Sequence, residues 1–483
     1  MESSFRTAGE LLAALRAGEV TSVELTDEAI ARIERDDGVI NAICVPDFER
    51  ARAAAQRADE ARARGEDRPL LGVPVTVKES YNVAGLPTTW GMPPHRDFVP
   101  AEDAVQVSRV KAAGAVVLGK TNVPLGLQDI QSFNDLYGTT TNPWDPGRTS
   151  GGSSGGSAAA LAAGFGALSL GSDIAGSLRT PAHFCGVYAH KPTLGLAAVR
   201  GMVPPAEPAL PVDLDLAVVG PMARSARDLT LLLDVMAGPD PLTHGVAHRI
   251  ALPPARHERI GDHRVLVLDD HPLIPTSAAV RAGVHRVAAA LEDGGARVEH
   301  HSALLPDLSE AATLYMQLLI SGSIRRFPIE SLERLEARAT GLDAVRLRAM
   351  AFSHSDWLEA NHRRDLHRQA WRQLFTEFDA VLCPITPTPA FPHDHHPNPM
   401  ERRITVDGAE YPYFDQLVWA GLATMPGLPA TAIPAGLSPE GLPVGVQLVG
   451  PMFEDRTPLW LAELLEERIG GFQAPKRAVG AGG

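Results

Sequence analysis

The residues best suited to chemistry lie in a glycine- and serine-rich stretch between residues 147 and 181. This stretch reads GRTSGGSSGGSAAALAAGFGALSLGSDIAGSLRTP. A serine hydroxyl becomes a nucleophile when a neighbouring group removes its proton, and glycine lets a backbone approach another group closely. The stretch therefore predicts a loop that binds a phosphate, presents a nucleophile, or only packs a helix against a strand.

Simple motifs leave these three alternatives open. A phosphate-binding loop requires G-x-x-x-x-G-K-[ST], but Ser157 stands where the lysine is needed. A nucleophile elbow requires G-x-S-x-G, which occurs around both Ser153 and Ser154, yet it also needs a downstream acid and a histidine. The third alternative, a glycine-rich turn that packs a helix against a strand, requires no catalytic residue.

Longer motifs in the chain resemble the amidase signature family. The runs 151–157 and 171–181 are similar to that family's glycine-serine signature, and GVPVTVKE at 72–79 is similar to its lysine strand. Further similar stretches lie at 184–193 and 441–447. The resemblance extends from about residue 7 to residue 468.

The resemblance implies catalytic roles for three residues. Ser177 matches the nucleophile that forms the acyl-enzyme, Ser153 matches a bridging serine that follows a cis peptide, and Lys78 matches the base. A lysine accepts a proton only when it is neutral, so burial must lower its pKa. Lys78 ends the apolar run 73–77, and a hydroxyl at Ser153 could both donate and accept the transferred proton.

The resemblance also implies an oxyanion hole made by the backbone N–H groups of Ile174, Ala175 and Gly176. The residues expected to support this loop from behind are Asp173, Arg179 and Ser154. The family usually has glycine where Ala175 stands. If that position requires a positive φ, alanine costs about 1 kcal/mol there.

Two other sets of residues could carry chemistry. His393, His395 and His396 could chelate a metal, but they lie in a proline-rich segment without a framework of further ligands. Cys185 could be a thiol nucleophile, although a free cysteine is usually a small core residue. The resemblance implies neither a metal nor an organic cofactor.

Hydrophobic periodicity predicts the helices and strands on which these residues lie. Helices are expected at 7–18 and 21–38, each with a capping box (Thr7 with Glu10, Thr21 with Glu24), and at 47–65. Continuous apolar runs predict buried strands, and helical patterns fall between them. The remaining expected elements are strands at 70–78, 115–120, 167–170, 265–268 and 380–383, helices at 105–114, 157–164 and 457–468, mostly helix over 276–375, and a hairpin of 430–435 with 444–449.

These patterns, together with the resemblance, predict an α/β fold. We expect one large α/β/α domain over residues 1–483, around a mixed, mainly parallel β-sheet. Residues 1–68 form an N-terminal helical segment on that core, and residues 470–483 form a flexible tail.

Composition restricts the function classes. The 483 residues are 45% hydrophobic and carry a net charge of −14, which favours a globular protein and disfavours nucleic-acid or membrane binding. The uncharged run 149–172 is too rich in glycine and serine to lie in lipid. Three scattered cysteines and the lack of an apolar signal-like start predict a cytoplasmic protein. We expect it to be a monomer or homodimer.

The resulting functional hypothesis is an amidase that hydrolyses linear carboxamides, with a small-molecule amide or carbamate as substrate. The segments expected to line its pocket are 125–133, the helical region around Met316, and 411–419, and their apolar character favours an aryl or hydrophobic amide. One alternative is a carbamate (urethane) hydrolase or esterase with the same residues. Another is the glutaminase-type component of a tRNA-dependent amidotransferase, although 126–130 lacks the acidic and aromatic pattern expected of it.

Overall fold

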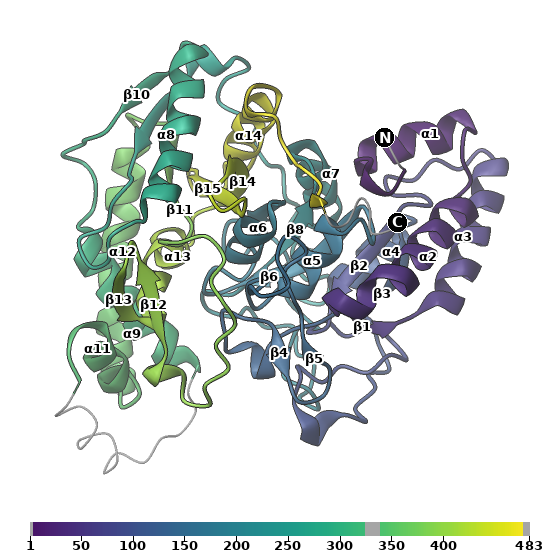
Figure 1. Cartoon of the computed structure of the whole chain (residues 1–483), viewed down its shortest axis with the longest axis horizontal. Helices are drawn as coiled ribbons and strands as arrows, with labels where there is room; N and C mark the ends of the chain where they lie inside the picture. The colour runs from purple at the N-terminus through teal and green to yellow at the C-terminus, as the bar shows by residue number, and fades with distance from the viewer. Residues whose placement is uncertain (1–2, 324–338, 477–483) are drawn as a thin grey trace.

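A single sheet of 11 strands runs through the computed structural model, which describes residues 3–323 and 339–476 (Figure 1). Its strand order is β1-β3-β2-β6-β8-β7-β14-β15-β11-β9-β10. The strands are β1 (Ile43–Pro46), β2 (Pro74–Lys78), β3 (Val116–Thr121), β6 (Leu168–Asp173), β7 (Tyr188–Lys191), β8 (Val218–Ala223), β9 (Arg264–Val267), β10 (Arg297–Glu299), β11 (Ala380–Pro384), β14 (Ala430–Leu437) and β15 (Pro443–Val449).

The sheet is mixed, as expected, and its parallel pairs lie in two flanks. β3, β2 and β6 are parallel on one side, and β11, β9 and β10 are parallel on the other. The strands between β6 and β11 pair antiparallel, as does the edge strand β1. The parallel pairing expected for most of the sheet is thus interrupted at its centre, where β14 and β15 form the expected hairpin.

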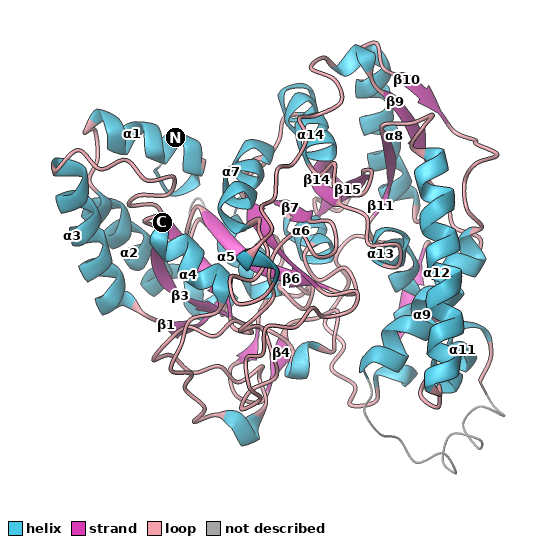
Figure 2. Ribbon diagram, turned by 180° about the vertical axis from the view of Figure 1, so that it is seen from behind, coloured by secondary structure: helices cyan, strands magenta, loops and turns pink. Residues whose placement is uncertain are grey.

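Helices cover both faces of the sheet (Figures 1 and 2). On β3, Val117 belongs to the apolar cluster that includes α4, α7, α8 and α14, whereas Val116 and Leu118 belong to the cluster that includes α2, α5 and α6. This alternation is the period of two that a strand buried on both faces imposes. The helices are α1 (Ala8–Ala17), α2 (Ser22–Ile40), α3 (Phe48–Ala63), α4 (Val105–Ala112), α5 (Gly155–Ala162), α6 (Arg179–Cys185), α7 (Ala226–Met236), α8 (Ala278–Asp293) and α14 (Arg456–Ile469).

A second group of helices packs on the part of the sheet that contains β9 and β11, beside a small hairpin (Figure 1). Strand residues Leu266 and Val381 face an apolar cluster built largely from these helices. The group comprises α9 (Leu308–Ser323), α11 (Gly341–Ala349), α12 (His354–Leu374) and α13 (Leu417–Thr424), with the hairpin β12 (Arg403–Val406) and β13 (Ala409–Pro412). A further short pair, β4 (Phe133–Asn134) and β5 (Gly138–Thr139), follows the 3-10 turn η3 (Leu125–Leu127).

Most expected elements are present near their expected positions. Both capping boxes form, so the starts of α1 and α2 are confirmed. The helical expectation for 276–375 holds for α8, α9, α11 and α12, but β10 interrupts it, and 324–338 lies outside the described residues. Of the expected tail, 477–483 also lies outside them.

Several elements were not expected from the sequence. Strand β8 contains Gly220 and Pro221, which weaken a strand pattern, and β7 carries the polar pair His190 and Lys191. Helix α13 is buried all round, so it shows no amphipathic period. Within the described residues, no helix has both the length and the apolar character needed to cross a membrane.

Candidate active site

The site is built where the parallel strands β2 and β6 end. Their register pairs Val77 with Leu170, and the carboxyl ends of parallel strands lie at the same edge of a sheet. Lys78, the last residue of β2, therefore comes beside Ser172 near the end of β6. The Lys78 Nζ atom lies 2.9 Å from Ser172 Oγ and 2.7 Å from Ser153 Oγ. Ser172 was not among the residues predicted from the motifs, although its place next to Lys78 follows from this strand pairing.

Ser153 lies in the loop that leads into α5. The peptide bond between Gly152 and Ser153 is cis. A Cβ atom at Gly152 would lie 2.5 Å from the carbonyl oxygen of Asp129, so only glycine fits there. The Ser132 hydroxyl donates to the Gly151 carbonyl at 2.9 Å, which fastens the same loop. Ser153 is only 3% exposed, so it lies almost fully buried within this closely packed loop.

Ser177 lies in the neighbouring loop, between β6 and α6. Its carbonyl accepts a hydrogen bond from the Ser154 N–H at 3.2 Å, so the two loops are joined through backbone atoms. The Ser154 hydroxyl donates to the Ser172 carbonyl at 3.3 Å. With both contacts on backbone atoms, Ser154 connects the loops, and the described residues give its hydroxyl no histidine partner. Ser177 is 7% exposed.

Burial gives Lys78 an unusual pKa. The side chain is 0% exposed, and loss of hydration lowers its pKa from 10.5 to about 7, while the charge of Asp173 acts in the opposite direction. A substantial fraction of Lys78 is therefore neutral at neutral pH. A neutral amine can donate to Ser172 and accept from Ser153 at the same time.

A buried ion pair holds the loop around Ser177. Arg179 contacts the Asp173 carboxylate through Nε at 3.0 Å and Nη2 at 2.9 Å, and both side chains are fully buried. Burial alone would raise the pKa of Asp173, but the Arg179 charge and its hydrogen bonds hold that pKa below its ordinary value. Arg179 also donates to the Ala420 carbonyl of α13 and to Gln447 of β15, so the loop is tied to the core.

The backbone N–H groups expected to bind an oxyanion differ in their partners. The Gly176 N–H donates to Asp173 Oδ1 at 2.9 Å, so it is already engaged. Ile174 and Ala175 have no hydrogen bond from their N–H groups within the described residues. The expected strain at Ala175 is absent, because the positive φ of this loop, +88°, belongs to Gly176.

Because the positive φ lies at Gly176 and not at Ala175, we expect different effects from substitutions at these two adjacent positions. Ala175→Gly should change kcat less than about threefold, since it only adds freedom to the loop. Gly176→Ala should lower kcat by about a hundredfold or more, because its Cβ would lie 2.8 Å from Thr180 Oγ1 and 3.0 Å from Ala420 Cβ at an unfavourable φ. Steady-state rates with an anilide, compared with thermal unfolding of each variant, would check both. A loss beyond a hundredfold in Ala175→Gly would contradict the loop assignment.

The three segments expected to line the pocket meet in one apolar cluster. Ile130, Met316 and Trp419 belong to the same cluster, although they come from the 125–133 loop, α9 and α13. Ile174 and Ala175 pack against this cluster. The loop with the free N–H groups therefore borders a largely hydrophobic region.

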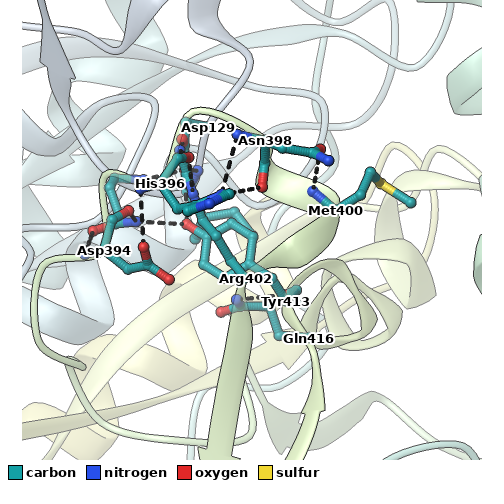
Figure 3. Close-up of polar contacts among 10 residues, drawn as sticks. Asp129, Asp394, His396, Asn398, Met400, Arg402, Tyr413 and Gln416 are labelled. Atoms are coloured by element: carbon teal, nitrogen blue, oxygen red, sulfur yellow. Dashed lines mark hydrogen bonds and ion pairs between the residues drawn. The ribbon is translucent and has the colours of Figure 1, made fainter.

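A polar network around Asp129 and Arg402 fixes the 129–131 backbone (Figure 3). This backbone packs against Gly152. The Arg402 guanidinium pairs with the Asp129 carboxylate, and the Tyr413 hydroxyl donates to Asp129 Oδ1 at 2.7 Å. Asp129 in turn accepts hydrogen bonds from the N–H groups of Ile130 and Gln131. The 129–131 loop is thus held by Arg402, which precedes β12, and by Tyr413 in the 3-10 turn η7 (Tyr413–Gln416). No sequence motif indicates the pair of Asp129 and Arg402, because the two residues are distant in the chain.

The other candidates adjoin this arrangement. The His396 carbonyl accepts a hydrogen bond from Arg402 Nε at 2.9 Å (Figure 3), and Cys185 Sγ lies 3.5 Å from the Ser150 carbonyl. His395 stacks on Phe133 with ring centroids 3.9 Å apart, and the His393 ring contacts the Pro146 carbonyl. Over residues 3–323 and 339–476, no group of three or more potential ligands from His, Cys, Asp and Glu could hold a metal ion. Cys185 is buried, which raises the pKa of its thiol and disfavours the reactive thiolate.

Comparison with known proteins agrees with the motifs. The Amidase family model matches residues 24–459. The chain is 34% identical to a glutamyl-tRNA(Gln) amidotransferase subunit of Roseiflexus sp. (strain RS-1), covering 95% of each chain. It is 32% identical to indoleacetamide hydrolase of Bradyrhizobium diazoefficiens, covering 96% of this chain and 86% of the relative.

A solved structure extends this similarity to the fold. A protein from a vestigial complex connected with the origins of an s-triazine catabolic enzyme superposes with a TM-score of 0.82 at 31% identity, covering 97% of this chain and 100% of that one. The expected resemblance, the α/β fold class and the expectation of an enzyme are thereby confirmed. The chain belongs to the amidase signature family.

Proposed function

We propose that this enzyme hydrolyses the C–N bond of a small carboxamide with a hydrophobic or aromatic acyl group, through an acyl-enzyme on Ser177. The observation that carries the proposal is the buried contact between Lys78 and Ser153, 2.7 Å long, in a lysine with a pKa of about 7. A base of this pKa can take a serine proton near neutral pH, which a solvated lysine cannot do.

The proposed acylation step uses a proton route of two side chains. Ser177 Oγ bonds to the carbonyl carbon while its proton passes to Ser153, and the proton of Ser153 passes to Lys78. The electron pair of the carbonyl moves to oxygen, where the N–H groups of Ile174 and Ala175 can donate. As the C–N bond breaks, the proton on Lys78 returns through Ser153 to the leaving nitrogen, which departs as ammonia or an amine.

The deacylation step repeats this route with water. A water molecule gives its proton through Ser153 to Lys78 as its oxygen bonds to the acyl carbon. The returning proton restores the Ser177 hydroxyl, and the acid is released. Every group in these steps belongs to the chain, the substrate or water.

We also propose that the enzyme works in the cytoplasm, as a monomer or homodimer.

The hydrophobic preference is supported by the cluster that borders Ile174 and Ala175. The same residues could also cleave a carbamate or an ester, because only the leaving group and the acyl heteroatom differ. The similarity to an amidotransferase component supports a second candidate function, release of ammonia from glutamine within a complex.

A panel of substrates would separate these functions. We expect purified protein alone to hydrolyse an arylacetamide and an anilide with kcat/KM at least tenfold above that for L-glutamine, with a phenyl carbamate, an aryl ester and a fatty amide as further comparisons. Release of ammonia, amine or alcohol gives the rates. Activity on glutamine alone, together with a stably co-purifying partner, would overturn the proposal in favour of the amidotransferase role.

A further inference from the structure

Tyr315 contacts the proposed oxyanion loop from the side of the helical group. Its hydroxyl donates to the carbonyl oxygen of Ile174 at 2.9 Å. The side chain is 0% exposed, and burial raises the pKa of Tyr315, so the hydroxyl stays protonated and remains a donor. Neither the motifs nor the mechanism above uses this residue.

The ring of Tyr315 is held in place by a close helix contact. A Cβ atom at Gly421 of α13 would lie 2.4 Å from Tyr315 Cδ1, so the ring lies directly on the backbone of that helix. Tyr315 comes from α9, and its cluster also contains Met316 and Trp419. Because the ring is fixed between α9 and α13, the hydroxyl has a defined direction toward the loop.

The carbonyl of Ile174 and the N–H of Ala175 belong to one planar peptide group. In a trans peptide these two bonds point in opposite directions, so a hydrogen bond on the oxygen fixes the direction of the N–H. Donation to the oxygen also polarises the peptide and strengthens its N–H as a donor. The Ala175 N–H has no hydrogen-bond partner within the described residues.

We propose that Tyr315 is a positioning residue for the reaction, which orients and polarises the Ile174–Ala175 peptide so that the Ala175 N–H meets the developing oxyanion. This inference rests on the proposed function. The Asp173 carboxylate holds the other end of the loop through the Gly176 N–H, so the two anchors lie on either side of the Ala175 N–H.

The test removes only the hydroxyl, with Tyr315→Phe. Loss of one positioning hydrogen bond should lower kcat for an anilide about three- to tenfold, with little change in KM. Affinity for an arylboronic acid, which mimics the tetrahedral intermediate on Ser177, should fall by a similar factor. Affinity of the Ser177→Ala protein for the intact anilide should not change when Tyr315→Phe is added. A merely structural role would not lower kcat and boronate affinity while leaving KM and anilide affinity unchanged.

Tyr188→Phe is the matched control, because the Tyr188 hydroxyl is also buried but has no hydrogen-bond partner among the residues that the structure describes. It should leave kcat and boronate affinity unchanged. Unchanged kcat and boronate affinity in Tyr315→Phe would overturn the inference, as would a rise in KM alone, which would indicate a pocket wall. Should Ser177→Ala keep its activity, the proposed function itself would fail, whatever Tyr315→Phe does.

Discussion

Replacing Ser177 with alanine is expected to lower kcat for an arylacetamide by about 10⁴-fold or more, since no oxygen remains to attack the carbonyl. The fold should survive, because the Ser177 hydroxyl makes no hydrogen bond to the described residues and the backbone bond from Ser154 remains. Ammonia release and thermal unfolding, measured on the same preparation, would check both parts.

The nucleophile can also be located directly. A fluorophosphonate should add to Ser177 in the wild-type protein, as peptide mapping would show, and should not label Ser177→Ala. Ser154 provides an internal comparison, since its hydroxyl is hydrogen-bonded to the backbone of Ser172. An adduct on Ser154 would instead favour the nucleophile-elbow alternative and would contradict the proposed role of Ser177.

The second large effect is expected at Lys78. Lys78→Ala should lower kcat nearly as much as Ser177→Ala does, because the two residues act as one unit in the proposed mechanism. Lys78→Arg should not restore activity, since a guanidinium keeps its charge. In the wild-type protein only the neutral lysine can accept a proton. Its pKa of about 7 therefore predicts that kcat/KM rises with pH toward a plateau above 7 and falls about tenfold per pH unit below it. A pH series on an anilide measures this profile.

A control is required because a second buried lysine titrates in the same range. Burial, reinforced by the nearby Arg179 charge, lowers the pKa of Lys191 to about 7. Its Nζ donates a hydrogen bond to the Pro192 carbonyl at 2.9 Å. Lys191→Met should keep the acidic limb of the profile. Loss of that limb in Lys191→Met, or near wild-type anilide turnover in Lys78→Ala, would contradict the role of Lys78.

The leaving group gives an independent check of the same role. An alkoxide leaves an ester without the protonation that an amine requires. Lys78 variants should therefore lose more activity on an anilide than on the matching ester. Equal losses on both substrates would mean that Lys78 does not return a proton to the leaving nitrogen.

Local sequence patterns are enough to predict the elements that contain the site and the residue types in it. Apolar runs predict β2 and β6, and glycine and serine positions predict the loops that precede α5 and follow β6, because these signals are local and need no distant partner. The signature motifs likewise pointed to Lys78, Ser153 and Ser177. They did not identify Ser172, whose contact with Lys78 depends on the pairing of two strands.

The pKa values and hydrogen-bond partners of these residues depend on contacts between distant segments of the fold. The pKa of Lys78 depends on burial by many segments, and the partners of Asp129 and Ile174 come from residues far along the chain, Arg402 and Tyr315. The positive φ considered for Ala175 occurs instead at Gly176, where glycine adopts it without strain, because the loop conformation follows from its contacts with Asp173 and α13. A local pattern records which groups a segment carries, whereas desolvation and the direction of each N–H arise when distant segments pack together.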